Sequence, residues 1–219
     1  TSEVVNLFDG CESLTSVTLP AGLLTMGSYV FRNCTSLVKV TYSGYEGEYN
    51  ALPETLSILG SSSFANCAFD NISIPEALKS TNSSVFSGCN LVRVAYNAIA
   101  MTTTGVLKDM TNLTQVVFGD KVESLPGHSF YGCVNLQNVT LPDSIETIAF
   151  RDCNAMTEIV LGKNVILDGG RVFWGWTEEQ TIYVKQSAYM SFRLWSTSWM
   201  EECNATIVWD YVGTQESDS

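Results

Sequence analysis

The sequence predicts a solenoid of about eight coils, each of roughly 22 residues and each carrying one strand of a parallel β-sheet. Three observations favour this fold class: a repeated apolar pattern, a short spacing between its copies, and a strand-like alternation inside each copy. A period in the low twenties is too short for repeats built from two helices, and it suits a coil that carries one strand. The 219 residues are therefore expected to stack into one unit with a continuous core.

The repeated pattern starts with an aromatic or leucine anchor and continues with a cysteine, a leucine, a valine and a further apolar residue. Phe8 and Cys11 open the first copy, and Phe130 and Cys133 open a close copy of it. The eight anchors are Phe8, Phe31, Phe64, Phe86, Leu107, Phe130, Phe150 and Phe173. Their spacings are 23, 33, 22, 21, 23, 20 and 23 residues, which average 22 when the 33 is set aside. In each copy the Val-x-Leu step alternates as a strand does.

One position of the repeat holds six of the seven cysteines, namely Cys11, Cys34, Cys67, Cys89, Cys133 and Cys153. Met110 and Trp176 take this position in other coils, which indicates that it is used as apolar volume. We expect six buried free thiols, because parallel side chains from adjacent coils do not point at each other as a disulfide requires. Cys203 lies outside the column, and the pattern does not place it. No cysteine pair has C-x-x-C spacing, so we predict no metal site.

These residues resemble the leucine-rich repeats of BspA-type bacterial surface proteins over residues 4 to about 184. The unit of that family reads approximately Leu-x-x-Val-x-Ile-Pro, an Ile-Gly turn and Ala-Phe-x-x-Cys, and the turn is recognisable here as Met26-Gly27 and Leu59-Gly60. The resemblance implies a right-handed leucine-rich repeat solenoid with its parallel sheet on the concave face. It also implies a place at the surface of a bacterium, a use in adhesion or protein binding, and no catalytic residues. We expect no cofactor.

The predicted domain organisation has three parts. Residues 1–184 form the solenoid, with an insertion at 43–53 in the long interval, and residues 185–212 form a C-terminal cap of the same domain. Residues 213–219 are expected to be a disordered acidic tail. The chain enters a repeat almost at once, without an initiator Met or a signal peptide, so we expect a mature or truncated fragment of an exported protein.

The cap is predicted to be a helix followed by a strand. Ser187 is a plausible N-cap, and apolar aromatic residues then recur at helical spacing. They are Tyr189, Phe192, Trp195 and Trp199. A final strand is expected over residues 206–209. Such a cap would cover the core cross-section that the last coil exposes.

In a leucine-rich repeat, the strand residues that flank the inward valine point to the concave face, which makes them the candidate binding surface. They are Ser16, Thr18, Lys39, Thr41, Asn71, Ser73, Arg93, Gln115, Asn138, Thr140, Glu158, Thr181 and Tyr183, with Ala95, Val117 and Val160 as apolar members. The insertion supplies a second candidate, whose residues Tyr45, Glu46, Glu48 and Tyr49 are the least core-like in the chain. We interpret the face as a broad polar surface and not as a pocket. A strand face that is merely soluble and an insertion that is merely tolerated are the competing interpretations.

The charge distribution narrows the class of partner. The formal net charge is -12, of which residues 43–60 contribute -3 and residues 201–219 contribute -5, so the solenoid body is nearly neutral. The 11 Lys and Arg residues form no basic stripe for nucleic acid, and no apolar run approaches the length of a membrane span. We therefore expect neither nucleic acid as a partner nor membrane insertion by this chain.

The leading hypothesis is a non-enzymatic cell-surface or secreted module that binds a protein or another cell-surface macromolecule. His128 is the single histidine, and the repeat places it on a coil turn without a specified partner, so no catalytic role is predicted for it. A second hypothesis is a carbohydrate-binding module that uses exposed aromatics such as Tyr45, Tyr49 or Tyr183. A third is a structural spacer in a larger surface protein, and a hydrolase is the weakest hypothesis.

Overall fold

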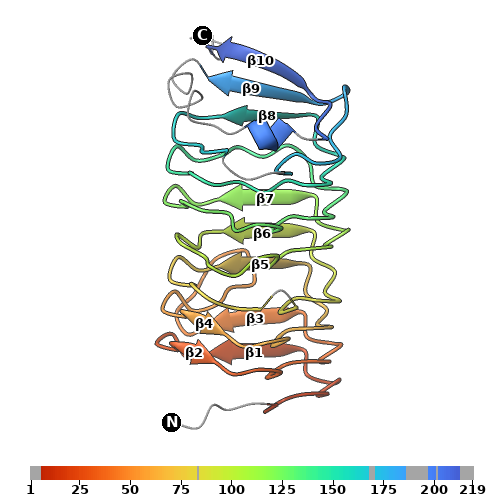
Figure 1. Ribbon diagram of the computed structural model, residues 1–219. Coiled ribbons are helices and arrows are strands. Elements are labelled where there is room, and N and C mark those ends of the chain that lie inside the picture. The colour runs from red at the N-terminus through yellow and green to blue at the C-terminus, as the bar shows by residue number, and fades with distance from the viewer. Residues whose placement is uncertain (1–5, 83, 168–170, 186–196, 201, 213–219) are drawn as a thin grey trace, which may run out of the picture.

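The coils stack along one axis, as the repeat predicts. The computed structural model describes residues 6–82, 84–167, 171–185, 197–200 and 202–212. They form about eight turns of a β-solenoid whose main strands lie one above another on one face (Figure 1). Every strand pair is parallel, because each coil returns the chain to the same face in the same direction.

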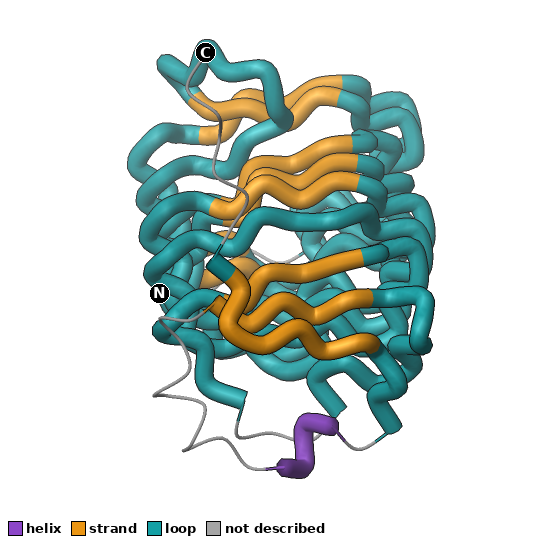
Figure 2. Tube along the Cα trace, turned by 90° about the horizontal axis from the view of Figure 1, so that it is seen from above, coloured by secondary structure: helices purple, strands orange, loops and turns teal. Residues whose placement is uncertain are grey.

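The main strands are short and follow the Val-x-Leu steps of the repeat. They are β1 (Ser16–Leu19), β3 (Lys39–Tyr42), β5 (Asn71–Ile74), β6 (Arg93–Tyr96), β7 (Gln115–Phe118), β8 (Glu158–Leu161), β9 (Thr181–Lys185) and β10 (Thr206–Tyr211). A second, shorter ladder pairs β2 (Thr25–Met26) with β4 (Ile58–Leu59). The remaining element is the 3-10 helix η2 (Thr197–Met200), the one helix drawn in the described part of the chain (Figure 2).

The sheet is interrupted where a continuous ladder was predicted. Strands pair in the orders β1-β3, β5-β6-β7 and β8-β9-β10. The coil at Asn138–Leu141 carries no strand, although the repeat predicts one there. The Asn138 side chain explains part of this difference, because its Oδ1 accepts the backbone N–H groups of Thr157 at 2.8 Å and Glu158 at 3.2 Å. A side chain thus occupies donors that a neighbouring strand backbone would use.

The insertion causes the other interruption, between β3 and β5. Its last residues enter the sheet as an extra rung, since the Ala51 N–H donates to the Val40 carbonyl at 2.9 Å. On the other side, the Ser73 N–H donates to the Asn50 carbonyl at 2.7 Å. Asn50, Ala51 and Leu52 are all buried. The expectation of a loop at 43–53 is therefore right only for its first part, because residues 50–52 are buried and Ala51 forms a parallel β-bridge with Ser73.

The anchors form the predicted aromatic column inside the coils. Phe8, Phe31, Phe64 and Phe86 stack with ring centroids 5.2, 5.4 and 6.2 Å apart in succession. Further along, Phe130 and Phe150 stack at 5.5 Å. Except for Phe8, which ends the column and is 38% exposed, these rings are buried. The column is the spine of one continuous core.

A turn with positive φ precedes the cysteine position in every coil. The residues there are Gly10, Asn33, Asn66, Gly88, Asp109, Gly132, Asp152 and Gly175, all of them types that tolerate the left-handed region. Three glycines also make room for the coil before them, because a Cβ at Gly88, Gly132 or Gly175 would collide with an Asn or Asp side-chain oxygen. The Asn or Asp before the cysteine position of one coil thus packs against the Gly at the same position of the next coil. The pairs are Asn66 with Gly88, Asp109 with Gly132, and Asp152 with Gly175.

The C-terminal end is described in part. The predicted helix from Ser187 through Tyr189, Phe192 and Trp195 lies outside the described residues, as does the tail at 213–219. Trp199, in η2, is buried with its ring edge-on to Phe173 at 6.1 Å. The predicted final strand is confirmed as β10, which pairs with β9.

Candidate binding surface

The candidate face residues form two aligned columns on the outer side of the strands. Asn71, Arg93 and Gln115 are register partners across β5, β6 and β7, and Ser73, Ala95 and Val117 are partners in the second column. The register also aligns Ser16 with Lys39, Thr18 with Thr41, Glu158 with Thr181, and Val160 with Tyr183. All of these side chains are exposed or half-buried, while the residues between them point into the core.

The insertion loop and the strand face meet. The Arg93 guanidinium lies over the Tyr49 ring, 5.6 Å from its centroid. Tyr45 packs against Tyr42 with ring centroids 5.0 Å apart, and burial raises the pKa of the Tyr45 hydroxyl. Glu46 and Glu48 stay exposed. The structure therefore brings the two candidate sites, which are separate in sequence, into one surface.

Several of the predicted face residues have other partners in the chain, Asn138, Asn71 and Tyr183 among them. Asn138 accepts two backbone N–H groups, as described above, and Asn71 Oδ1 accepts the Asn50 N–H at 2.6 Å. The Tyr183 ring packs against Tyr211 at 4.7 Å. These contacts stabilise the sheet and its C-terminal end. The side chains that make them are therefore less available to a binding partner than those of Lys39 and Gln115.

Two hollows lie on either side of the coil at Asn138, where the sheet is interrupted. The prediction of a broad strand face did not include them. One, of about 540 Å³, is lined by Asn138, Thr140, Glu158, Val160, Lys185 and Tyr211 among others. The other, of about 330 Å³, lies on the β7 side and includes Gln115 and Val117. The strand face is therefore not flat along the solenoid axis, because it is hollowed where the strand ladder is missing.

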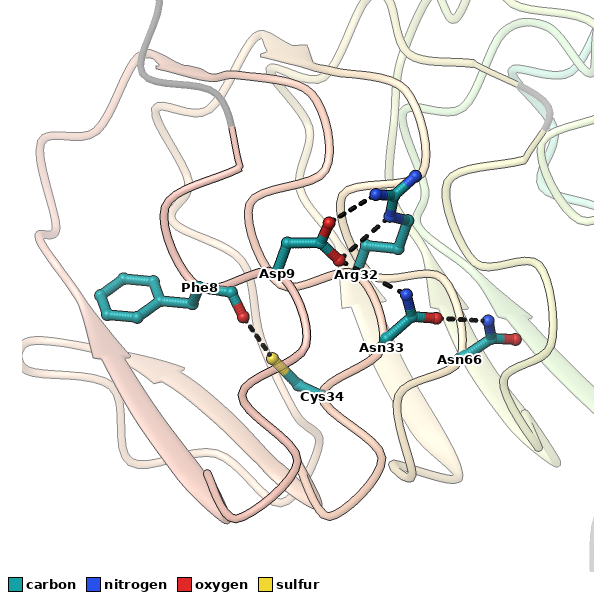
Figure 3. A network of polar contacts seen from close by, with 6 residues as sticks. All are labelled: Phe8, Asp9, Arg32, Asn33, Cys34 and Asn66. Atoms are coloured by element: carbon teal, nitrogen blue, oxygen red, sulfur yellow. Dashed lines mark hydrogen bonds and ion pairs between the residues drawn. The ribbon is translucent and has the colours of Figure 1, made fainter.

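A polar network joins the turns of the first three coils (Figure 3). Arg32 forms a two-point ion pair with Asp9, and the Asn33 Nδ2 donates to Asp9 Oδ1 at 3.4 Å. The hydrogen bond from Arg32 lowers the pKa of the Asp9 carboxyl. Asn66 Nδ2 then donates to Asn33 Oδ1 at 2.8 Å. Because each coil satisfies the polar groups of the next, this network aligns the coils and leaves few groups for a ligand.

The cysteine column is more than apolar volume. Each Sγ–H after the first coil donates to the backbone carbonyl of the anchor one coil earlier: Cys34 to Phe8, Cys67 to Phe31, Cys89 to Phe64, Cys133 to Leu107 and Cys153 to Phe130, at 3.0 to 3.3 Å. Trp176 makes the same bond through its indole Nε1–H, to the Phe150 carbonyl at 3.0 Å. The position is thus a donor site in these six coils, which explains why Trp176 substitutes for a thiol, whereas Met110, which has no donor, fills it as apolar volume.

The burial prediction for the thiols needs one correction. Cys34, Cys67, Cys133 and Cys153 are buried and Cys89 is half-buried, but Cys11 is exposed. Cys11 belongs to the first coil, and among the described residues no earlier coil covers it. Cys203, which the repeat left unplaced, is half-buried and packs against the core. All seven cysteines are free.

Maleimide labelling with mass spectrometry should separate these thiols. In the native protein Cys11 is expected to react fast and Cys133 and Cys153 very slowly, because burial hides them and raises the pKa of the Cys133 thiol to about 12. After unfolding without reductant, all seven cysteines should react. Fewer than seven labels would show that some form disulfides, and fast native labelling of Cys153 would contradict its burial.

His128 lies on a coil turn, as its place in the repeat predicts. His128 is exposed, has a φ of 63°, and places its ring edge-on to Tyr131 at 5.8 Å. Across the described ranges, no three His, Cys, Asp or Glu side chains gather closely enough to hold a metal ion. Within the same ranges, no helix is long and apolar enough to cross a membrane.

Sequence reasoning missed the residues directly after the anchors. Arg32, Lys108, Tyr131, Arg151 and Trp174 occupy that position and stand on the outer side of the turns. Five of the eight coils carry a basic or aromatic residue there, and this bias is the signal that could have found them.

Comparisons with known proteins agree with the geometry. The family described as BspA type leucine rich repeat region matches the chain in six copies, over residues 5–51, 46–154 and 103–204. Among solved structures, a leucine-rich repeat protein from Bacteroides ovatus is 23% identical with a TM-score of 0.64, and the match covers 93% of this chain. A leucine-rich repeat protein from T. pallidum is 21% identical with a TM-score of 0.40, over 79% of this chain and 72% of that one.

The match covers 56% of the Bacteroides ovatus protein, so the chain spans little more than half of that relative's length. No curated protein matches the chain. At 23% identity, the likeness to the Bacteroides ovatus protein supports the fold alone.

Proposed function

Since this chain belongs to the BspA-type leucine-rich repeat family, we propose that it is a non-enzymatic, cell-surface or secreted module that binds a protein through its strand face. The family is surface-associated, and leucine-rich repeat proteins are typically protein-binding and non-catalytic. The observation that carries the proposal is the joining of the insertion loop to the face at Tyr49 and Arg93. It makes one continuous surface from residues that are far apart in sequence.

The chemistry of this surface suits a protein partner. Exposed Lys39 and Arg93 supply positive charge, and the exposed Glu46 and Glu48 of the loop supply negative charge. Aromatic residues and arginine, such as Tyr49 and Arg93, are enriched at protein interfaces. The two open columns offer a broad area, as recognition of a folded partner requires. Adhesion is one use of such a surface.

Binding measurements with matched variants test the proposal. A partner is first captured from host or bacterial surface extracts on the immobilised protein and identified, and its affinity is then measured in solution. Arg93→Ala combined with Tyr49→Ala should weaken binding by at least about tenfold, because both side chains lie at the centre of the proposed surface. Asn138 is left unchanged, since its side chain holds the backbone of Thr157 and Glu158.

Lys79→Ala is the control, because Lys79 is exposed and its neighbour Ser80 forms a β-bridge with Ile58 of the shorter ladder, not with the main strands. It should leave the affinity unchanged. Equal losses in both variants, or full binding by the double variant, would refute the strand-face proposal. Capture of glycans on an array, with loss on Tyr45→Ala or Tyr49→Ala, would favour a carbohydrate-binding module instead.

A further inference from the structure

A row of alternating cationic and aromatic side chains runs along the turns of the later coils. Lys108 and Arg151 lie over the Tyr131 ring, 5.1 and 4.9 Å from its centroid. Arg151 also lies over the Trp174 ring at 4.9 Å, and Arg171 lies over the same ring at 4.5 Å. Cation–π contacts of this kind fix the guanidinium groups in place. The coil spacing thus builds a preorganised row of positive charge.

A groove of about 430 Å³ lies beside this row. Two of its lining side chains, Arg151 and Arg171, are positively charged, and the His128 imidazole lines it as well. Most of the others are aliphatic, namely Leu125, Pro126, Ile148, Ala149, Ile166 and Val172. Among the described lining residues there is no carboxylate. The groove shares no lining residue with the strand face, so it is a separate site.

The charge of the groove differs from that of the rest of the chain. The protein carries a formal net charge of -12, yet Arg171 has no carboxylate within ion-pair distance among the described residues. Arg151 shares its Nε–H with Asp152 Oδ2 at 3.3 Å. At physiological ionic strength, charges farther away than about 8 Å are largely screened, so a ligand in the groove responds mainly to nearby charges, among them Arg171 and the Arg151 that Asp152 partly pairs.

We propose that this groove binds a short acidic peptide segment, with a carboxylate paired to Arg171 and Arg151 and a neighbouring aliphatic side chain on the apolar floor. Guanidinium groups recognise carboxylates through paired N–H donors, and arginine clusters read acidic motifs in this way. The aliphatic floor formed by Ile148 and Ile166 matches a leucine or isoleucine side chain in kind. A saccharide fits less well, because the aromatic faces of Tyr131 and Trp174 are already covered by cations.

The probe is a fluorescein-labelled peptide with glutamate, leucine and glutamate flanked by glycines, and the matched probe has glutamine in place of both glutamates. Fluorescence anisotropy with the intact chain should show saturable binding of the acidic peptide and a Kd at least about tenfold higher for the neutral one. Arg171→Gln should weaken acidic-peptide binding by at least about tenfold, and Arg171→Lys should recover part of that loss, since it keeps the charge but not the planar fork.

Lys79→Gln removes the same single charge from an exposed site outside the groove and is expected to bind the peptide as the unchanged protein does. Ile166→Ser tests the apolar floor and should weaken binding of the leucine-containing peptide. Circular dichroism and thermal melting confirm that each variant is folded. Equal losses in Arg171→Gln and Lys79→Gln, equal affinity for both peptides, or saturable binding of a heparin oligosaccharide without any of the acidic peptide would overturn the proposal. None of these outcomes bears on the strand face, because the two sites share no residue.

Discussion

Phe64→Ala should lower the free energy of unfolding by about 3–5 kcal/mol, the cost expected for truncating a fully buried phenylalanine. The Phe64 ring is fully buried between Phe31 and Phe86, and the edge of Phe69 closes the site at 5.7 Å. Its removal leaves a cavity inside the column where neither adjacent coil can collapse without losing its own stacking. Urea unfolding followed by circular dichroism measures the effect, with the slope of the transition checked for two-state behaviour.

Phe8→Ala is the matched control, because Phe8 has the same place in the repeat and stacks on Phe31 at 5.2 Å, but it ends the column and is 38% exposed. Its loss should cost about 1 kcal/mol, since part of the ring already contacts water. Equal effects at the two positions would show that stability does not depend on the place of a ring in the column. An effect below about 1 kcal/mol at Phe64 would contradict the continuous core.

The repeat predicted the fold because its anchors and valines report burial directly. A residue that recurs every 22 or so positions and is always apolar points inward in every coil, and the strand alternation then fixes which residues point outward. The face columns could be predicted for this reason, and Arg93 and Gln115 lie where the pattern places them.

The details that the sequence did not reveal depend on hydrogen bonds between coils. Cys67 and Trp176 look unrelated as side chains, and their shared role appears only when the carbonyl of the preceding anchor is seen opposite each of them. The missing strand at Asn138 has this origin in part, since Asn71 at the same repeat position begins a strand, whereas the Asn138 Oδ1 accepts the N–H groups of Thr157 and Glu158. Composition alone cannot show which polar atom faces which.

The strand face and the insertion loop, the two parts of the candidate site, could each be predicted from the sequence. Their contact with each other could not. The contact of Tyr49 with Arg93 joins residues more than forty positions apart in the sequence, across the width of β5. Such a contact depends on the path of the loop, which the repeat does not encode because the insertion occurs once. The Asn50 rung was missed for the same reason: its residues read as part of an irregular insertion, although Leu52 and Pro53 repeat the end of the strand pattern.

Asn50→Ala should lower the free energy of unfolding by about 2–4 kcal/mol, because it leaves one buried and two part-buried backbone groups without their partner. Asn50 is 4% exposed. Its Oδ1 accepts the Val40 N–H at 2.8 Å, and its Nδ2 donates to the carbonyls of Val38 and Asn71, both at 3.2 Å. The side chain therefore completes the ladder between β3 and β5. Asn112→Ala is the control, since Asn112 pairs with Asn90 on the exposed surface and should cost less than about 0.5 kcal/mol.

Asn50→Asp separates the hydrogen bonds from simple volume, because it keeps the shape but replaces the two N–H donors. An ionised carboxylate would face the carbonyls of Val38 and Asn71, so burial and repulsion should raise the folded-state pKa of the new carboxyl above its usual value of about 3.9. A raised folded pKa means that the variant is most stable below the unfolded pKa and loses stability as the pH rises through the folded one. Unfolding measured across this range should therefore show Asn50→Asp falling below Asn50→Ala near neutral pH. A pH-independent difference between the two variants would mean that the Asn50 side chain is not enclosed by the two strands.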